Sequence, residues 1–208
     1  MEQTCNQILL RGELDALPAF SHESHGRRFY TFPLLVERLS GTLDRLCCMA
    51  PEELVQELDP FDGPMIELQG QVRSFNNRSG TGRRLVISAY AATLAACEGS
   101  PANEVTLRGI VCRRPVFRRT PLGREICDLM LAVNRPYRRT DYLPCILWGR
   151  TAQACAGLEP GTQLALTGRL QSRSYIKQLE DGGSEERTAY EISAITAQPL
   201  PEPEPALC

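Results

Sequence analysis

The chain has 208 residues, of which 42% are hydrophobic, and its 23 basic and 25 acidic side chains give a net charge of −2. This length suits two domains of ordinary size. The sequence has no run of 18 or more apolar residues, and its first residues lack the basic and apolar blocks of an export signal. Membrane spans are therefore excluded, and we expect a cytoplasmic protein.

Cysteine and histidine usage argues against a disulfide framework and against a metal. The nine cysteines include no Cys-x-x-Cys pair and lie mostly in apolar runs, so we expect reduced, small hydrophobic side chains. The only histidines are His22 and His25, and no cysteine pair with zinc spacing lies near them. The sequence predicts no metal and no cofactor.

An internal repeat is the most informative feature of the sequence. Eleven residues of the first half recur exactly 97 positions later, between Asn103 and Cys145: Asn6, Arg11, Gly12, Pro18, Phe20, Gly26, Leu34, Val36, Asp44, Leu46 and Cys48. The offset becomes 98 at Gly70 and Gly168, and 105 when residues 87–89 are aligned with residues 192–194. The difference between 98 and 105 predicts seven extra residues in the last hairpin of the second copy. Variation confined to one connection indicates a duplicated domain.

In the first copy, apolar residues are retained at the expected core positions. A helix is predicted at 51–58, where Pro51 suits a first helical position, and a short hairpin is predicted to turn at 79–82. The candidate core residues are Ile8, Leu10, Phe32, Leu34, Val36, Ile66, Leu68 and Ile87.

The second copy alternates apolar and polar residues over three segments, 105–111, 129–133 and 142–148, which predicts three strands. A helix follows at 150–158, and two more strands at 163–177 and 188–198 flank a turn at 180–184. Five strands with a helix between the third and the fourth are the plan of the oligonucleotide-binding (OB) fold. We therefore predict a mainly β protein with two tandem five-stranded OB barrels, each with one short helix between strands 3 and 4.

The net charge hides a difference between the two halves. Residues 1–101 carry 9 basic and 13 acidic side chains, a net charge of −4, whereas residues 102–198 carry 14 and 10, a net charge of +4. A polyanion would bind the second half. Seven arginines of that half lie in or beside predicted turns: Arg113, Arg114, Arg118, Arg119, Arg135, Arg138 and Arg139.

Aromatic residues of the second copy are interleaved with these cations. Tyr142 and Trp148 are six positions apart in one strand, so both point to the face opposite the apolar set that includes Leu143. Arg173, Tyr175 and Lys177 share a face of another strand, and Tyr137 lies among Arg135, Arg138 and Arg139. Rings that stack on bases and guanidinium groups that neutralise phosphates suit an unpaired nucleic-acid strand. Burial in a core or subunit interface is the alternative for Trp148 and Tyr142.

Motifs throughout residues 103–198 resemble the bacterial single-stranded DNA-binding protein family. They include Asn-Glu-Val-x-Leu-x-Gly at 103–109, Asp-Tyr-x-Pro-Cys-x-x-Trp-Gly at 141–149 and Gly-Arg-Leu-Gln-Ser-Arg at 168–173. The resemblance implies single-stranded DNA binding, largely without sequence preference, in replication, recombination or repair. It also implies that the aromatics at Tyr137, Tyr142, Trp148 and Tyr175 stack on bases, and that four barrels assemble around the strand.

The first copy departs from this pattern. The 97-residue offset puts Ser40, Arg45 and Pro51 in the places of Tyr137, Tyr142 and Trp148, and no residue matches Tyr175. We therefore expect a degenerate barrel that is kept for folding or assembly. Phe29, Tyr30 and Phe75 remain candidate weak contacts, although packing is the simpler interpretation of Phe29 and Phe75.

These observations divide the chain into a degenerate OB domain at 1–97, a linker at 98–102, a DNA-binding OB domain at 103–198 and a short Pro-rich acidic tail at 199–208. Two barrels per chain would let a homodimer present four. The tail differs from the long linker and acidic tip common in the family, so recruitment of replication or repair proteins through such a tip is in doubt.

Two other functions compete with this one: a primosomal-type or scaffold adaptor whose barrels bind protein, and a single-stranded RNA binder. An enzyme is the least favoured class, because the sequence has no Ser/His/Asp set and no glycine-rich phosphate loop.

Overall fold

The computed structural model describes residues 6–58, 65–77, 85–178 and 182–201 of the chain. The predicted turn at 79–82 and most of the tail lie outside these residues. Twelve strands and two short helices follow one another in the described part: β1 (Asn6–Leu14), β2 (Ala19–Ser24), β3 (Arg27–Glu37), β4 (Leu43–Pro51), α1 (Glu52–Gln56), β5 (Met65–Asn76), β6 (Leu85–Ala96), β7 (Ala102–Val111), β8 (Val116–Arg119), β9 (Glu125–Arg135), β10 (Arg139–Trp148), α2 (Gly149–Cys155), β11 (Gln163–Gln178) and β12 (Ser184–Pro199).

Each half of the chain closes into a small barrel with the same topology. In the N-terminal barrel, β1 pairs with both β3 and β5, and β4 and β6 complete the ring through the one parallel pairing of this half among the described strands. In the C-terminal barrel, β7 pairs with both β9 and β11, and β10 and β12 pair in parallel. These are the two predicted OB folds.

Each half contains one strand more than predicted. The extra strands, β2 and β8, are exposed throughout and each pairs only along the outer edge of the following strand. Such a short hairpin arm has no buried face, and for that reason hydrophobic alternation did not reveal it. The five barrel strands and the helix before the fourth of them agree with the prediction.

The alternating strand residues pack into the two barrel interiors. Leu10, Leu34 and Leu46 in the first barrel, and Leu131, Leu143 and Leu166 in the second, are at most 1% exposed. All eight core residues expected in the first copy are buried. The seven cysteines in the described part are free, and four of them are buried among these apolar side chains.

Paired glycines allow the strands to approach closely at equivalent places. A Cβ atom on Gly70 or Gly168 would overlap a carbonyl oxygen of the neighbouring strand, that of Tyr90 or Ser193. Both glycines lie at a β-bulge, where the register of the last hairpin shifts by one residue. This recurrence explains why the repeat preserved glycine at these two positions.

The strand registers correct one feature of the repeat. Val72 pairs with Ala89, and its equivalent Leu170 pairs with Ile192, so the offset in the last strand is 103 and the second hairpin is longer by five residues, not seven. The parallel pairs give the same value, because Cys48 opposes Ala89 and Cys145 opposes Ile192. The tripeptide Ile-Ser-Ala occurs at both 87–89 and 192–194, but in the structure these two segments are two positions out of register.

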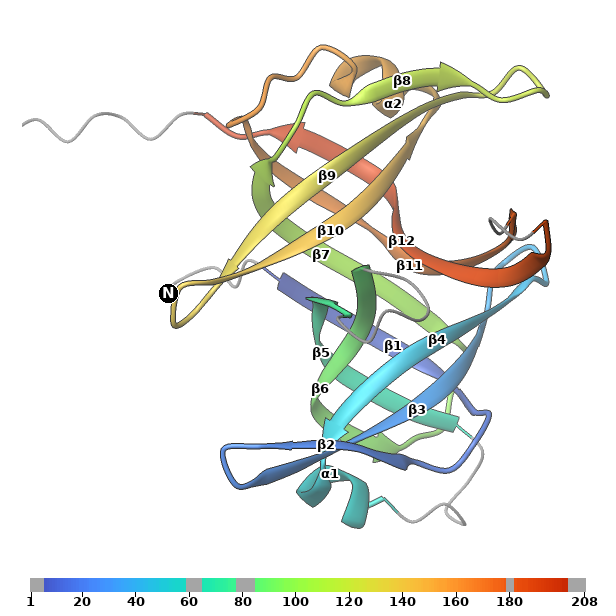
Figure 1. The fold of residues 1–208 in the computed structure, drawn as a ribbon, viewed down its shortest axis with the longest axis vertical. Helices are drawn as coiled ribbons and strands as arrows, with labels where there is room; N and C mark the ends of the chain where they lie inside the picture. Colours follow the sequence, from blue (N-terminus) through green and yellow to red (C-terminus); the bar gives the residue numbers. More distant parts are fainter. Residues whose placement is uncertain (1–5, 59–64, 78–84, 179–181, 202–208) are drawn as a thin grey trace, which may run out of the picture.

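The two barrels share one continuous sheet. Strands β1 and β7 pair antiparallel from Asn6 opposite Leu107 to Arg11 opposite Ala102, which joins the barrels edge to edge. Figure 1 shows these strands crossing the middle of the molecule, with α1 and α2 at opposite ends. Among the described residues, neither helix is long and apolar enough to cross a membrane.

Two buried carboxylates bridge the barrels in a pseudo-symmetric way. Asp44 in the N-terminal barrel accepts a hydrogen bond from the amide of Ser172 in β11 (2.7 Å), and Asp141 in the C-terminal barrel accepts one from the amide of Ser74 in β5 (2.7 Å). Each carboxylate also pairs with an arginine of its own barrel, Arg38 at 2.6 Å and Arg135 at 2.8 Å. We refer to these contacts as the interbarrel bridges. They hold the β3–β4 hairpin against the C-terminal barrel and the β9–β10 hairpin against the N-terminal barrel.

Candidate nucleic-acid interface

Strand β10 carries an outward-facing aromatic strip. Leu143 and Leu147 point into the barrel and are fully buried, whereas Tyr142 and Trp148 on the opposite face are 49% and 38% exposed. Six residues of strand separate the two rings by about 20 Å. The parity expected from the sequence is thus present in the structure, and neither ring is sealed in the core.

Trp148 lines a groove that we call the Trp148 groove. It encloses about 720 Å³ and is lined by Arg38, Arg118, Thr120, Arg124, Ile126, Ile146, Trp148, Arg169, Gln171, Ser172, Arg173, Glu191, Ser193, Ala194 and Ile195. The indole nitrogen of Trp148 donates a hydrogen bond to the hydroxyl of Ser193 (3.2 Å), which holds the ring across the groove. Five arginines and one carboxylate line the groove, and two of the arginines, Arg38 and Arg118, are paired with Asp44 and Asp128 outside the lining.

Arg38 reaches the Trp148 groove from the N-terminal barrel. Its guanidinium donates to the Ser172 carbonyl oxygen (3.2 Å) and is held by both oxygens of Asp44. The interbarrel bridge therefore also places a cation of the first half at the interface of the second. The hydrogen bond to Asp44 is the main reason why the pKa of Arg38 is raised.

The predicted residues at the tip of the β9–β10 hairpin are highly exposed. Tyr137 is 95% exposed, and both Tyr137 and Arg138 have positive φ angles, 62° and 54°. Non-glycine residues adopt this left-handed conformation only occasionally. The turn carries its ring and guanidinium group away from the barrel body, and Figure 1 shows the hairpin extending towards the other half of the molecule.

The β11–β12 arm holds the third group of predicted residues. The guanidinium of Arg173 lies 5.8 Å from the centre of the Tyr175 ring and 3.9 Å from Glu191. Tyr175 is half-buried, while Lys177 is exposed two residues further along the same face. Arg173 lines the Trp148 groove, so this arm continues outward from it.

Arg135 occupies a different environment from the one expected. Its side chain is only 18% exposed and pairs with the fully buried Asp141, which makes it part of an interbarrel bridge. Burial raises the pKa of Asp141, whereas the Ser74 amide and Arg135 oppose that shift. Arg135 is thus a structural partner of a buried carboxylate as well as a candidate for phosphate contact.

Arg135 and Arg139 do not line the Trp148 groove. They line a second groove on the N-terminal barrel, which we call the Tyr90 groove, of about 490 Å³. Its other lining residues are Ser21, His22, Ser24, Phe29, Met49, Arg73, Ser74, Phe75, Ser88 and Tyr90. The predicted site residues are therefore divided between two grooves and two hairpin tips.

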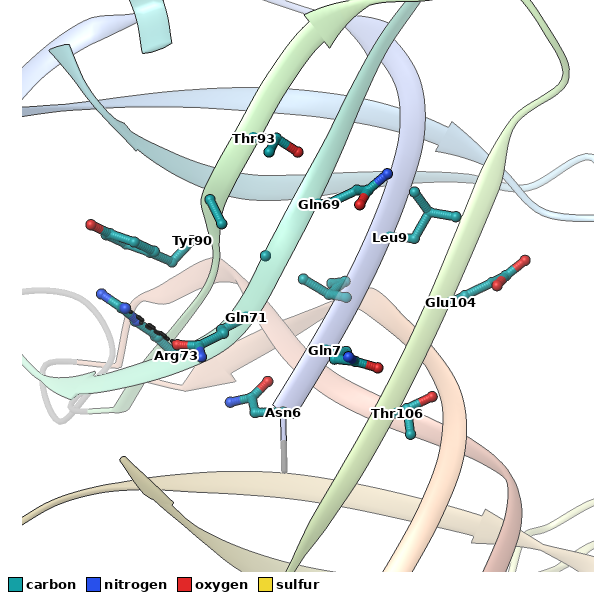
Figure 2. A pocket seen from close by; sticks show the side chains of 13 residues that line it. Asn6, Gln7, Leu9, Gln69, Gln71, Arg73, Tyr90, Thr93, Glu104 and Thr106 are labelled. Atoms are coloured by element: carbon teal, nitrogen blue, oxygen red, sulfur yellow. Dashed lines mark hydrogen bonds between the residues drawn. The ribbon is translucent and has the colours of Figure 1, made fainter. Parts of the chain in front are cut away.

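A third hollow, of about 600 Å³, lies on the outer face of the sheet formed by β6, β5, β1 and β7 (Figure 2). Gln7, Gln69, Glu104 and Thr106 give it a polar lining. Arg73 belongs to this hollow and to the Tyr90 groove, and Figure 2 shows it beside the Tyr90 ring.

Arg38, Arg118, Arg124 and Arg169 line the Trp148 groove but were not predicted as site residues from the sequence. Parity was sufficient to find Arg169, which lies four residues before Arg173 on the same face of β11. Arg118 was noticed only as a turn residue. Nothing in the local sequence indicates that Arg38 reaches the other barrel, because that contact depends on the sheet that joins the two halves.

No three His, Cys, Asp or Glu side chains of the described residues are grouped as metal ligands would be. What the two grooves present instead are aromatic faces, guanidinium groups and hydroxyls. This chemistry suits non-covalent binding of a planar, anionic ligand.

Comparison with known proteins identifies the family. The model of the single-strand binding protein family matches residues 102–200. A single-stranded DNA-binding protein of Halalkalibacterium halodurans is 38% identical over 80 residues, which are 35% of this chain and 48% of that protein. Single-stranded DNA-binding protein B of Bacillus subtilis is 35% identical over 80 residues, and the match covers 71% of its length. The chain belongs to the single-strand binding protein family.

These matches have limits in length. The chain spans about half the length of several curated relatives that it matches, from 48% to 62% for three of them. The crystal structure of the wild-type single-stranded DNA-binding protein from Thermus aquaticus matches 98% of this chain with a TM-score of 0.77 at 22% identity. That likeness extends over both barrels and supports the tandem OB fold.

Proposed function

We propose that this protein binds single-stranded DNA, largely without sequence preference, and serves in DNA replication, recombination or repair. The observation that carries the proposal is the half-exposed indole of Trp148 lying across a groove lined by five arginines. Bases stack on the aromatic rings of Trp148 and Tyr142 of β10. Guanidinium groups displace the counterions of the phosphates. Membership of the single-strand binding family supports this proposal.

The binding surface that we propose has three parts. Tyr142 and Trp148 supply stacking faces along β10, and Tyr137 with Arg138 and Arg139 extends them at the hairpin tip. Tyr175, Arg173 and Lys177 form the opposite arm. Arg135 contributes through its place in the interbarrel bridge, next to the Tyr90 groove. Catalysis plays no part in the proposed function.

Quenching of Trp148 tests the proposal directly, because it is the only tryptophan of the chain. We expect oligo-deoxythymidine to quench its fluorescence saturably. The affinity should fall with salt, with a slope of about −0.7 in log K against log salt for each phosphate neutralised. Duplex DNA of the same length serves as the control and should quench weakly.

Two outcomes would favour other functions. Absence of quenching in a folded protein that forms stable complexes with other proteins would favour the adaptor. Stronger quenching by oligo-uridine than by oligo-deoxythymidine would favour an RNA ligand, because only RNA carries the 2′-hydroxyl.

The proposed assembly is a homodimer that presents four barrels. One chain has a mass of 23.1 kDa and contains two barrels, so light scattering should report twice that mass. A protein with this function would work in the cytoplasm.

A further inference from the structure

The Trp148 groove and the Tyr90 groove occupy equivalent places on the two barrels. The strand registers relate eight lining residues of one to eight of the other: Arg118 to His22, Ile126 to Phe29, Ile146 to Met49, Gln171 to Arg73, Ser172 to Ser74, Arg173 to Phe75, Glu191 to Ser88, and Ser193 to Tyr90. The 97-residue offset relates a ninth pair, Arg38 and Arg135. Arg38 of the N-terminal barrel thus lines the Trp148 groove, and Arg135 of the C-terminal barrel lines the Tyr90 groove. The N-terminal barrel therefore retains the groove itself.

The aromatic surface of the N-terminal groove is built from other positions. Pro51 stands where the C-terminal barrel has Trp148. The indole of Trp148 lies against Ser193, to which it donates a hydrogen bond, and opposes Ile126 in the strand register. In the N-terminal barrel these two neighbouring positions are Tyr90 and Phe29, and their ring centres lie 6.2 Å apart. The N-terminal barrel thus carries aromatic rings on β3 and β6, the two strands that pair with β4, on which Pro51 lies.

Two more rings extend this surface. His22 stacks on Phe29 with 5.1 Å between ring centres and 17° between planes. Phe75, which replaces Arg173, is 47% exposed on β5. His22 covers one face of Phe29, so Phe75 is the most exposed of the phenylalanine and tyrosine rings that line this groove.

Cations accompany these rings. The guanidinium of Arg73 lies 3.4 Å from the centre of the Tyr90 ring, and Arg135 and Arg139 enter from the C-terminal barrel. The residues that line the groove include no carboxylate. Burial is the main reason why the pKa of Arg73 is lowered; Arg135 adds to that shift, whereas Tyr90 and Asp141 oppose it.

We propose that the Tyr90 groove is a second binding site for single-stranded DNA, in which bases stack on Tyr90, Phe29 and Phe75 while Arg73 and Arg139 contact phosphates. The site rests on the proposed function. It revises the expectation that the first barrel serves only folding or assembly, because the stacking surface has been relocated within an equivalent groove. The charge of −4 over residues 1–101 does not oppose it, since the local lining is cationic and two of its arginines belong to the other half.

The test compares a short with a long strand. An oligo-deoxythymidine of about 8 nucleotides fits one OB fold, whereas one of about 30 can reach both grooves. The first variant, His22→Ala with Phe75→Ala, changes two exposed side chains, so the fold should be unaffected. The second variant, Tyr90→Leu, keeps an apolar side chain at the bulge. Phe20→Ala is the matched control, because Phe20 is 53% exposed on the same arm but does not line the groove.

We expect both variants to bind the long strand at least about 10-fold more weakly, measured by anisotropy of labelled DNA, because each loses base stacking. Quenching of Trp148 by the short strand should remain as in the wild type, and Phe20→Ala should match the wild type in both assays. Wild-type affinity of both variants for the long strand would overturn the second site while leaving the proposed function intact. Absence of Trp148 quenching in the wild type would refute the proposed function, and this site with it.

Discussion

The two barrels of this protein share a fold, an equivalent groove and a pair of reciprocal bridges, but they place their aromatic residues differently. The C-terminal barrel carries its rings on β10, at Tyr142 and Trp148. The N-terminal barrel has Arg45 and Pro51 at those places and carries rings at Phe29 and Tyr90 on the neighbouring strands β3 and β6. The two grooves therefore carry aromatic rings at different positions, whereas Arg38 and Arg135 keep equivalent places.

Position-by-position comparison does not find the rings that line the groove of the first barrel. A binding groove is lined by several strands, and a ring reaches the same space from any of them. Net charge has the same weakness, because the Tyr90 groove of the acidic half is lined by three arginines, two of which lie in the other half of the chain.

The largest effect is expected from the interbarrel bridges. Asp44→Ala and Asp141→Ala each leave an arginine that is at most 20% exposed without its carboxylate, and a serine amide without its acceptor. Breaking a buried pair in this way costs about 3 kcal/mol of unfolding free energy. Urea unfolding should show similar losses for the two variants, since their contacts are equivalent.

The control for this prediction is Arg114→Ala, which removes an ion pair that is exposed on both sides. It should leave the urea midpoint unchanged. A large loss for only one of the two aspartate variants would break the equivalence of the two barrels at their junction.

The next effect concerns the stacking positions of β10. Tyr142→Ala should weaken binding of oligo-deoxythymidine by about 10-fold to 100-fold, since stacking on one ring contributes about 1–3 kcal/mol. Arg45→Ala, at the equivalent place of the N-terminal barrel, should leave the affinity unchanged. Quenching of Trp148 measures both variants. A large loss of affinity for Arg45→Ala would mean that β4 contacts DNA at this position as β10 does.

The smallest effect is a change in salt dependence. Arg169→Gln removes one guanidinium from the Trp148 groove, so the slope of log K against log salt should decrease in magnitude by about 0.7. Arg114→Gln lies outside both grooves and should keep the wild-type slope. An unchanged slope for Arg169→Gln would show that Arg169 does not contact phosphate.

Much of the fold followed from the sequence alone. The 97-residue spacing, the alternating strands and the paired glycines predicted two OB barrels, because side-chain alternation and close strand approach are local requirements that recur in every copy. The outward direction of Tyr142 and Trp148 followed from parity in the same way. The exposed arms β2 and β8 were missed, since neither has a buried face that would impose a pattern.

The placement of the site required the tertiary structure. Pairing of β1 with β7 joins the barrels, and only that junction brings Arg38 to the Trp148 groove and Arg135 to the Tyr90 groove. The register of β6 and β12, which a short sequence match placed two residues wrong, decides that Tyr90 stands where the other barrel has Ser193. The sequence determined what each strand buries, because burial depends on period and composition. Which side chains meet across a groove depends on contacts between distant strands, and no local pattern records them.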